Sequence, residues 1–476
     1  MDEDENVVAE QRKFDVVVLG AGSGGYTAAV RAAQLGLSTA IVEERFWGGV
    51  CLNIGCIPTK SLLRNAEVAH LVQSKADVFG ISSDTPITVD YGAAYARSRS
   101  VVDGRVRGVN FLMRKNKIVQ IDGHGEFLDA HRLRVEGQVL TFEHCIIDVG
   151  ATTNMLPGTR VSARVVTYEE LILAESLPRS AVVIGAGAIG AEFTYLLRAF
   201  GVDVTLVEYQ ERILPTEDAD VSKEVTRWFR RSGVAMHTGV EVISVRDNGD
   251  ELNSATVQFR PRDGGESPRE VTADLVLQAV GFSPRLDGYG LGRTGVLTTG
   301  RGAIEVDECC RTSQPHIFAI GDVTGKLMLA HVADAMGIIA AESIAGEETM
   351  PLNYTMIPRV TFCQPQVASF GLTEEQAVAA GHVVKVASFP FSANGKAPAL
   401  DETAGFVKIV ADAVHGELLG AHLVGADVAE LLPELTLAQM WDLTVHEVAR
   451  NVHAHPTLSE AVKEAIHGIA GHMINF

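Results

Sequence analysis

The chain has 476 residues, which is long for a single hydrophobic core and suits two to four domains. With 46% hydrophobic and 21% charged residues it has the composition of a globular protein, and no apolar run reaches the roughly 18 residues that suggest a membrane span. Its 60 acidic and 40 basic residues give a net charge of -20, which disfavours nucleic acid as a partner because phosphate backbones are held by clustered lysine and arginine.

The acidic N-terminus, MDEDENVVAE, is unlike a signal or transit peptide. We expect residues 1–13 to form a short disordered tail. The six cysteines of the chain are too few for a disulfide scaffold, so we expect a reducing cytoplasm. A disulfide that forms in such a compartment is more often catalytic than structural.

Residues 14–36, FDVVVLGAGSGGYTAAVRAAQLG, combine an apolar β-branched run, a glycine-rich turn and an alanine-rich segment with helical periodicity. A second apolar run, STAIVEE, follows, so the pattern predicts strand, turn, helix, strand. In a G-x-G-x-x-G turn the first glycine permits a tight turn, the second lets a pyrophosphate approach the backbone, and the third lets the helix pack closely. The motif consists of Gly20, Gly22 and Gly25, and Glu43 follows 23 residues after its first glycine.

The stretch GGVCLNIGCIPTK, residues 48–60, places Cys51 and Cys56 five positions apart. They could be half of a metal site, a structural staple, a redox couple or a chance pair. Zinc usually takes four ligands, and no second pair with suitable spacing stands nearby. Because the pair begins a helix, the helix dipole is expected to lower the thiol pKa. This context favours a redox couple that faces a cofactor held by the first glycine-rich turn, with the chance pair still open.

Residues 62–120 contain long helical stretches such as LLRNAEVAHLVQS, and short strands are predicted in KIVQIDGHGEF and RLRVEGQVLTF. Residues 180–201, SAVVIGAGAIGAEFTYLLRAFG, then repeat the plan of the first copy and continue into DVTLVE. The second motif consists of Gly185, Gly187 and Gly190, and Glu208 follows 23 residues after its first glycine. A turn without a ligand is the alternative for each motif, but this context favours two bound dinucleotides.

The acidic residue of the second copy indicates which dinucleotide binds there. A carboxylate at Glu208 accepts hydrogen bonds from a ribose 2′-hydroxyl and repels a 2′-phosphate. The next three residues, YQE, add no arginine, and Arg212 after them is the one feature that favours NADP. We therefore predict NAD rather than NADP.

Further along, DNGDEL and RPRDGGESPRE are polar and rich in turn residues, and we place them in strand connections. A third apolar strand, HIFAIGD, precedes a helical segment, and from about residue 352 short strands followed by helices predict a separate domain. The four other cysteines are expected to be chemically inert. The adjacent pair Cys309-Cys310 has no further metal ligand nearby, and Cys145 and Cys363 have the character of buried small hydrophobic residues.

Near the C-terminus, HAHPTLSE places His455 five residues before Glu460. A glutamate at this distance can orient the histidine as a general base with a set tautomer. Most histidines are polar surface or cap residues, so this pair gains weight only as the proton acceptor that a dithiol reaction requires.

Taken in this order, GGVCLNIGCIPTK, the two glycine motifs, HIFAIGD and HAHPTLSE resemble the flavin-dependent disulfide reductases, from about residue 14 to the C-terminal HMINF. The resemblance implies an α/β fold with two Rossmann-like dinucleotide-binding domains and a C-terminal α+β dimerisation domain. The expected domains after the tail are an FAD-binding domain (14–155), an NAD-binding domain (156–280), a central domain that completes the FAD site (281–351) and an interface domain (352–476).

The family pattern also implies which residues hold the cofactors. The first motif and Glu43 would bind the ADP half of FAD, and Asp322 would contact its ribityl portion. Lys60 would lie beside the flavin and pair with Glu192, and Gly125 would also belong to the cofactor site. The residues assigned to NAD are the second motif, Glu208 and Gly281.

The resemblance implies that Cys51 meets the substrate and that Cys56 lies next to the flavin. His455, oriented by Glu460 and followed by a cis peptide bond, would act on the disulfide of the other subunit of a homodimer. The implied substrate is a dihydrolipoyl group carried by a 2-oxoacid dehydrogenase complex or by the glycine cleavage H protein. It would reduce the cysteines, and FAD and NAD would then receive the electron pair.

Other members of the family are the nearest alternatives. Glutathione and trypanothione reductases prefer NADPH, which Glu208 opposes. Mercuric reductase and large thioredoxin reductases carry C-terminal cysteines that the ending IAGHMINF lacks, and soluble transhydrogenases lack the cysteine pair. A redox sensor or scaffold is the non-enzymatic alternative, against which the complete set of cysteines, histidine and glutamate argues.

One segment departs from the family pattern. Asp148-Val149-Gly150 stands where the family usually reads Ala-Thr-Gly. A carboxylate near FAD is expected to weaken flavin binding or to shift the flavin's potential, provided that the Asp148 side chain points toward the cofactor.

Overall fold

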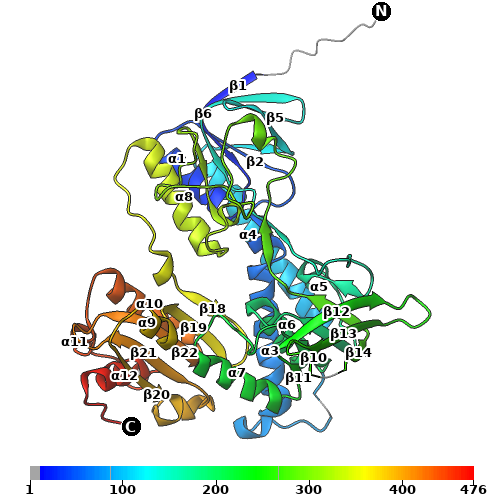
Figure 1. The fold of residues 1–476 in the computed structure, drawn as a ribbon, viewed down its shortest axis with the longest axis vertical. Coiled ribbons are helices and arrows are strands. Elements are labelled where there is room, and N and C mark those ends of the chain that lie inside the picture. Colours follow the sequence, from blue (N-terminus) through cyan, green and yellow to red (C-terminus); the bar gives the residue numbers. More distant parts are fainter. Residues whose placement is uncertain (1–10, 86, 266) are drawn as a thin grey trace, which may run out of the picture. The chain divides into compact units, whose positions relative to one another are not determined.

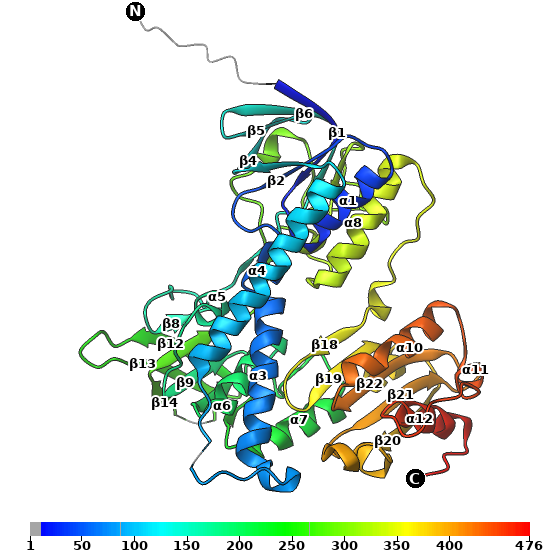
Figure 2. The ribbon, with the colours of Figure 1, turned by 180° about the vertical axis from the view of Figure 1, so that it is seen from behind.

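The computed structural model describes residues 11–85, 87–265 and 267–476. The chain folds into two compact units, each assembled from three separate segments (Figure 1, Figure 2). Unit 1 comprises the chain up to Ser61, Ala96–Asn154 and Gly281–Tyr354, and unit 2 comprises Leu62–Tyr95, Met155–Val280 and Thr355–Phe476. The first ten residues of the expected tail lie outside the described residues.

Unit 1 is built on a seven-stranded sheet of order β3-β2-β1-β6-β5-β4, with β17 paired to β6. Pairing is parallel among β3, β2, β1, β6 and β17 and antiparallel along β4-β5-β6. The strands are β1 (Gln11–Leu19), β2 (Thr39–Glu43), β3 (Val119–Asp122), β4 (Gly125–Asp129), β5 (Arg132–Val135), β6 (Gln138–Ile147) and β17 (Ile317–Ala319), with β7 (Ala151–Thr153) and β16 (Phe282–Pro284) forming a separate pair. β1 thus begins at Gln11, inside the segment expected to be tail.

Two helices of unit 1, α1 (Ser23–Gln34) and α8 (Ala330–Ala345), lie side by side in both ribbon views, and α1 packs on β1 and β2 of this sheet. The short helix α2 (Gly49–Asn53) precedes two long helices, α3 (Cys56–Ser74) and α4 (Tyr91–Lys115), which pass from one unit into the other. These confirm the helices predicted in residues 62–120. The central strands are buried on both faces, which is why they read as continuous apolar runs in the sequence.

Unit 2 contains a parallel sheet, β11-β10-β9-β15-β8, a three-stranded sheet, β12-β13-β14, and an antiparallel sheet, β18-β19-β22-β21-β20. The strands of the first two sheets are β8 (Val165–Val166), β9 (Ser180–Ile184), β10 (Asp203–Val207), β11 (Ala235–His237), β12 (Val240–Asp247), β13 (Ala255–Pro261), β14 (Arg269–Ala273) and β15 (Leu275–Gln278). Those of the third are β18 (Arg359–Thr361), β19 (Gln366–Gly371), β20 (Val384–Pro390), β21 (Phe406–Asp412) and β22 (Leu418–Gly425).

The helices of unit 2 fall into an earlier and a later group. The earlier ones are α5 (Tyr168–Ile172), α6 (Ala188–Ala199) and α7 (Ala219–Arg231). The later ones are α9 (Glu374–Ala379), α10 (Val428–Met440), α11 (Val445–Val448) and α12 (Glu460–Ala470), and α10 and α12 pack on the antiparallel sheet. The predicted change of pattern near residue 352 is therefore confirmed, as is the α/β fold class.

The internal repeat is confirmed as β1-α1-β2 in unit 1 and β9-α6-β10 in unit 2. In both sheets the first strand of the repeat lies between the second strand and a later parallel strand, giving β2-β1-β6 and β10-β9-β15. In each sheet, the strands on the two sides of β1 or β9 are connected in opposite directions, which makes this place a topological switch point. Open α/β sheets bind ligands at the carboxyl ends of the strands at such a point. Each glycine motif lies at this edge.

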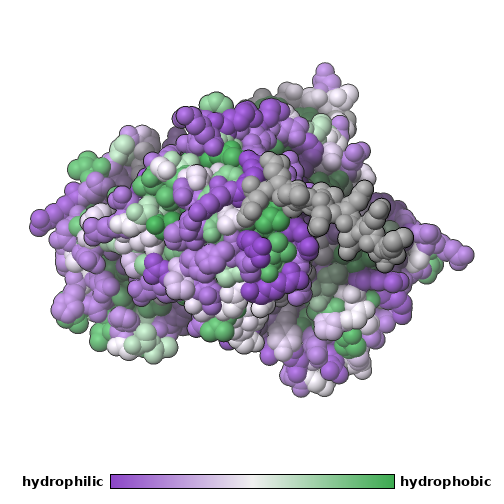
Figure 3. All heavy atoms as spheres, turned by 90° about the horizontal axis from the view of Figure 1, so that it is seen from above, coloured by the Kyte–Doolittle hydropathy of each residue, from purple (hydrophilic) through white to green (hydrophobic). Residues whose placement is uncertain are grey.

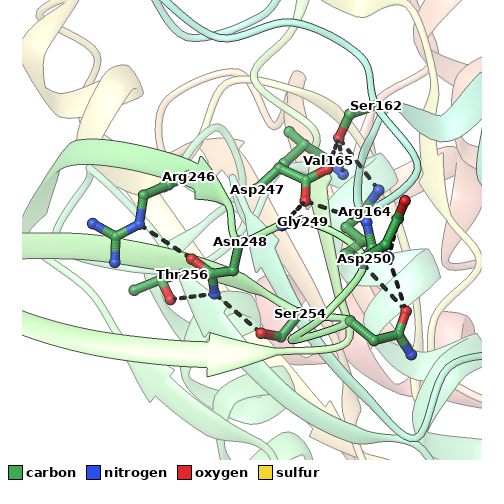
Figure 4. A network of polar contacts seen from close by, with 11 residues as sticks. Ser162, Arg164, Val165, Arg246, Asp247, Asn248, Gly249, Asp250, Ser254 and Thr256 are labelled. Carbon is green, nitrogen blue, oxygen red and sulfur yellow. Dashed lines mark hydrogen bonds and ion pairs between the residues drawn. The ribbon is translucent and has the colours of Figure 1, made fainter.

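A polar network in unit 2 holds the β12–β13 hairpin to the edge strand β8 (Figure 4). The buried guanidinium of Arg164 donates hydrogen bonds to Asp247 (3.4 Å), Asp250 (2.8 Å) and Asn253 (3.1 Å). Ser162 donates to the other oxygen of Asp247 at 2.6 Å. The polar stretch DNGDEL, predicted as a strand connection, is this hairpin turn.

The face drawn in Figure 3 is covered mainly by hydrophilic residues, and its hydrophobic residues form small separate groups. Within the described part of the chain, no helix combines the length and the apolar character needed to cross a bilayer.

Candidate active site

The first glycine of each motif lies where only glycine fits. Gly20 and Gly185 have positive φ angles of 103° and 96°. A Cβ atom would lie 2.2 Å from the carbonyl oxygen of Asp148 in the first case and 2.3 Å from that of Ala279 in the second. Both turns therefore run tightly against the end of the neighbouring parallel strand.

The third glycine of each motif lets the helix approach the turn. A Cβ atom at Gly25 would lie 2.1 Å from the carbonyl oxygen of Gly20, and the equivalent distance in the second copy is 1.8 Å. At the second glycine of the second copy, Gly187, a Cβ atom would meet nothing within 4 Å. This open space in front of a helix N-terminus fits the diphosphate of a dinucleotide.

The acidic residues of the two copies occupy equivalent positions. Glu43 accepts the N–H of Ala21 at 2.7 Å, and Glu208 accepts the N–H of Ala186 at 2.5 Å. The other oxygen of each carboxylate accepts the N–H of the residue two positions further along the chain. Each carboxylate is thus fixed at the rim of its glycine-rich turn, where ribose hydroxyls can donate to its remaining lone pairs.

Two arginines lie near the loop that follows β10. Arg212, the residue that favoured NADP, donates to the backbone carbonyl of Glu217 at 3.3 Å and lies 3.6 Å from the carboxylate of Glu375. Arg262, which the sequence analysis did not identify, stacks on Tyr209 at 4.1 Å from the ring centroid. Arg262 and Tyr209 are 53 residues apart in the chain, so no local sequence pattern could have paired them.

Cys51 lies on α2, and Cys56 is the first residue of α3. Gly55 between them allows a sharp change of direction, since a Cβ atom there would lie 2.9 Å from the carbonyl oxygen of Val50. The side chains of Cys51 and Cys56 are in hydrogen-bonding contact, so the fold brings the two members of the predicted redox pair together. Among the described residues no group of three or more His, Cys, Asp or Glu side chains is arranged to hold a metal ion.

The expectation that the helix dipole lowers the pKa of the cysteine pair is wrong for Cys51. The hydrogen bond to Cys56 and then burial raise the pKa of the Cys51 thiol. The physical reason is that these two effects outweigh the dipole of α2, a helix of only five residues on which Cys51 lies, while Cys56 alone stands at the N-terminus of the long helix α3.

The two glycines before the cysteines dock this segment onto the first motif. Gly48 donates its N–H to the carbonyl of Ala21 at 3.0 Å. Gly49 has a φ angle of 70°, and a Cβ atom there would lie 2.6 Å from the Cα atom of Gly22. The backbone of the cysteine segment therefore touches the glycine-rich turn directly, which the sequence did not reveal.

Substitution of Gly49 by Ala is expected to lower the free energy of unfolding by about 2 kcal/mol, because it adds a backbone clash to the strain of a positive φ angle. Gly36→Ala is the matched control, since Gly36 has a φ angle of 87° but no atom within 4 Å of its Cβ position. Thermal unfolding and the FAD content of the purified proteins would be compared. Equal values for the two variants would contradict a requirement for close approach.

Other residues assigned to FAD lie around the same edge of the sheet. Asp322 lies in a single 3-10 turn after β17, and burial raises its pKa to about 6. Gly125 begins β4, and a Cβ atom there would lie 2.5 Å from the Leu19 side chain at the end of β1. Lys60 follows Cys56 by one turn of α3, which places both on one side of the helix.

Glu192 lies on α6 in unit 2, is buried and accepts the N–H of Phe362 at 2.9 Å. Its pairing with Lys60 stays a prediction. Gly281, assigned to the nicotinamide side, has a φ angle of 98°, and its carbonyl accepts the N–H of Asn154 at 2.9 Å.

His455 and Glu460 form the pair that HAHPTLSE predicted. The imidazole Nδ1 lies 3.1 and 3.2 Å from the two carboxylate oxygens of Glu460, and the Thr457 N–H also donates to Glu460. Burial opposes ionisation of Glu460, but the hydrogen bonds from Thr457 and His455 prevail and lower its pKa. With Nδ1–H donating to this carboxylate, Nε2 is left as the proton acceptor on an imidazole that is 77% exposed.

A second histidine of the same motif has a different environment. The side chain of His453 is 4% exposed and its Nε2 lies 3.0 Å from Glu434, and this hydrogen bond raises the pKa of His453. The pair anchors the loop on α10, whereas His455 remains accessible. The His455–Pro456 peptide bond is cis, as the resemblance implied. The other cysteines differ in exposure: Cys145, Cys310 and Cys363 are buried, and Cys309 is partly exposed.

Comparison with known proteins covers almost the whole chain. Residues 14–337 match the family model described as pyridine nucleotide-disulphide oxidoreductase, and residues 357–466 match its dimerisation domain. Dihydrolipoyl dehydrogenase of Mycobacterium tuberculosis is 59% identical over 469 residues, which cover 97% of this chain and 99% of that protein. The enzyme of the same name from Corynebacterium glutamicum is 55% identical, with the same two shares covered.

Among solved structures, LpdA from Mycobacterium tuberculosis superposes with a TM-score of 0.88 at 26% identity, covering 96% of this chain and 99% of that one. The fold of this chain agrees with that match. The chain belongs to the pyridine nucleotide-disulphide oxidoreductase family.

Proposed function

We propose that this enzyme is a dihydrolipoyl dehydrogenase, which oxidises protein-bound dihydrolipoyl groups and reduces NAD. The observation that carries the proposal is the contact of Cys51 with Cys56 on a segment whose glycines touch the first dinucleotide motif. The identity to relatives of that name supports the choice of substrate. FAD and NAD are the cofactors of this family.

The proposed reaction begins with Cys51 and Cys56 joined as a disulfide. A thiolate of the dihydrolipoyl group attacks the sulfur of Cys51, which breaks the Cys51–Cys56 bond and leaves a thiolate on Cys56. The second dihydrolipoyl sulfur then attacks the mixed disulfide, closes the lipoyl ring and releases Cys51. Two electrons have then moved from the substrate to the cysteine pair, which is left as a dithiol.

The first glycine motif, Glu43 and Asp322 would hold FAD, which when bound accepts the electron pair from the cysteines and passes it to NAD. The second motif and Glu208 would hold NAD. The fixed Glu208 carboxylate favours the 2′-hydroxyl of NAD over the 2′-phosphate of NADP.

His455 would take the proton from the first substrate thiol through Nε2, because Glu460 holds Nδ1–H. We assign this role to His455 of the partner subunit in a homodimer. The matched dimerisation domain supports the dimer. Exposed hydrophobic side chains in this part of unit 2 support it as well, because their contact with water is unfavourable and a second subunit would cover them. They are Leu437, Trp441 and Val452.

The natural partners would be the lipoyl domains of 2-oxoacid dehydrogenase complexes or the glycine cleavage H protein, in the cytoplasm. The test is turnover of dihydrolipoamide with NAD by the FAD-loaded enzyme, compared with NADP as acceptor and with NADH-driven reduction of glutathione disulfide, mercuric ion and thioredoxin. We expect kcat/KM for dihydrolipoamide with NAD to exceed each of the others by roughly 100-fold or more. Activity on another disulfide without dihydrolipoamide turnover would overturn the proposal.

A further inference from the structure

The carboxyl group of Asp148 lies inside the first glycine-rich turn. Asp148 directly follows β6, is 7% exposed, and accepts the N–H of Gly25 on Oδ2 at 2.7 Å. The same oxygen lies 2.7 Å from the position that a Cβ atom would take at Gly22. Gly22 is the motif's second glycine, where the backbone admits a diphosphate. The side chain therefore points toward the cofactor position.

The other oxygen of this carboxyl group faces a second segment assigned to FAD. Oδ1 lies 2.7 Å from the position of a Cβ atom at Gly321, whose φ angle is 68°. Gly321 directly precedes Asp322. One side chain thus lies between the glycine motif on α1 and the 3-10 turn after β17.

The second copy of the repeat shows that the fold does not require a carboxylate here. Asp148-Val149-Gly150 corresponds to Ala279-Val280-Gly281, and in each case the first residue donates its N–H to the end of the motif's strand at 2.8 Å. At Gly187 in the second copy a Cβ atom would meet nothing within 4 Å, whereas at Gly22 it would meet Asp148. The carboxyl group is a feature of the first site alone.

The surroundings of Asp148 oppose a negative charge. Burial is the largest of the effects that raise the pKa of Asp148 well above its usual value. The hydrogen bond from the Gly25 N–H acts in the opposite direction and lowers the pKa. The charged side chains that act on it are Asp322 from the 3-10 turn, Glu43 from β2 and Asp334 from α8, and all of them are acidic. A diphosphate would add two more negative charges.

We propose that Asp148 binds the diphosphate of FAD as a neutral carboxylic acid, which accepts the Gly25 N–H on Oδ2 and donates the O–H of Oδ1, the oxygen on the side of Gly321, to a phosphate oxygen. The apoenzyme therefore takes up one proton on binding FAD wherever Asp148 is ionised beforehand. This inference rests on the proposed function only in assigning FAD to the first motif.

The sign of the pH dependence follows from this assignment. FAD affinity is greatest while Asp148 is protonated in the apoenzyme, and it falls as the pH rises through the pKa of that group. At pH values between the pKa of Asp148 in the apoenzyme and its pKa in the FAD-bound enzyme, the Kd for FAD rises about tenfold per pH unit. Asp322, whose pKa is about 6, contributes its own titration to every variant, so the difference between variants isolates Asp148.

The experiment titrates apoenzyme with FAD between pH 6 and pH 9, following the flavin fluorescence, and measures proton uptake calorimetrically in two buffers of different ionisation enthalpy. Asp148→Asn keeps the shape of the side chain without its titration, and Asp148→Ala copies the second repeat. We expect one proton fewer to be taken up by both variants, and a flatter pH profile with tighter FAD binding by Asp148→Asn at pH 9.

Equal proton uptake by wild type and Asp148→Asn at every pH, together with unchanged FAD affinity of Asp148→Ala at pH 6, would overturn the inference. Failure of every form to bind FAD at any pH would instead contradict the proposed function. Two controls guard against misfolding. Thermal unfolding of the apo forms compares their stability, and the Kd for NAD, which depends on unit 2, is expected to be the same in all three.

Discussion

Substitution of Cys51 by Ser is expected to lower NAD-dependent turnover of dihydrolipoamide by at least about 10⁴-fold and to leave FAD bound. A serine hydroxyl cannot form the mixed disulfide that begins the reaction, and without the Cys51 thiol Cys56 loses its partner in the redox pair. The glycines that dock the segment on the first motif are unchanged, so the flavin site keeps its backbone. Steady-state rates with dihydrolipoamide and the flavin absorbance of the purified variant are the measurements.

The matched variant Cys56→Ser separates the roles of the two thiols. With oxidised lipoamide, Cys51 of this variant can still attack the ring disulfide. The freed lipoyl thiol can close the ring again, but no Cys56 thiol resolves the mixed disulfide, so acid quenching traps the fraction of the adduct present at equilibrium. Mass spectrometry should find the lipoamide adduct on Cys51 in Cys56→Ser and no adduct on Cys56 in Cys51→Ser. The reverse pattern would show that the relay runs in the opposite order. Cys309→Ser, which alters a cysteine distant in sequence from the pair, should retain wild-type turnover.

Much of this fold was predictable because it depends on local sequence patterns. The β-branched runs of β1 and β9 are buried on both faces, and the glycines that follow occupy conformations or contacts that no other residue allows. The same holds for the pair of His455 with Glu460, whose members are five residues apart. Spacing alone sets these features, so one sequence suffices to find them.

The features that the sequence did not reveal depend on contacts between distant segments. The docking of Gly49 on Gly22 joins residues 27 positions apart, and Asp148 reaches Gly25 across 123 positions. The sequence raised the question of where Asp148 points, but only the packing of β6 beside β1 answers it. The error about the thiol pKa of Cys51 has a similar origin, because the break between α2 and α3 depends on the close approach at Gly55.

Replacement of His455 by Gln is expected to lower kcat for dihydrolipoamide by about 10²- to 10⁴-fold near neutral pH, because the substrate thiol then loses its proton acceptor. The loss should shrink as the pH approaches that at which the substrate thiol ionises unaided. Glu460→Gln should cost less, because it removes the group that fixes the Nδ1–H tautomer but leaves the imidazole. A pH–rate profile that is parallel for wild type and His455→Gln would contradict a role in proton transfer.

Mixing two inactive chains tests whether this histidine serves the other subunit. A dimer of one Cys51→Ser chain and one His455→Gln chain contains one site with an intact cysteine pair and an intact histidine only if each site combines residues of both subunits. Random exchange of subunits should then restore about a quarter of the wild-type activity per site. If each subunit instead used its own histidine, every site in the mixture would lack one group, and the activity would remain at the level of the separate variants. Recovery on mixing therefore requires that unit 1 of one chain work with unit 2 of its partner.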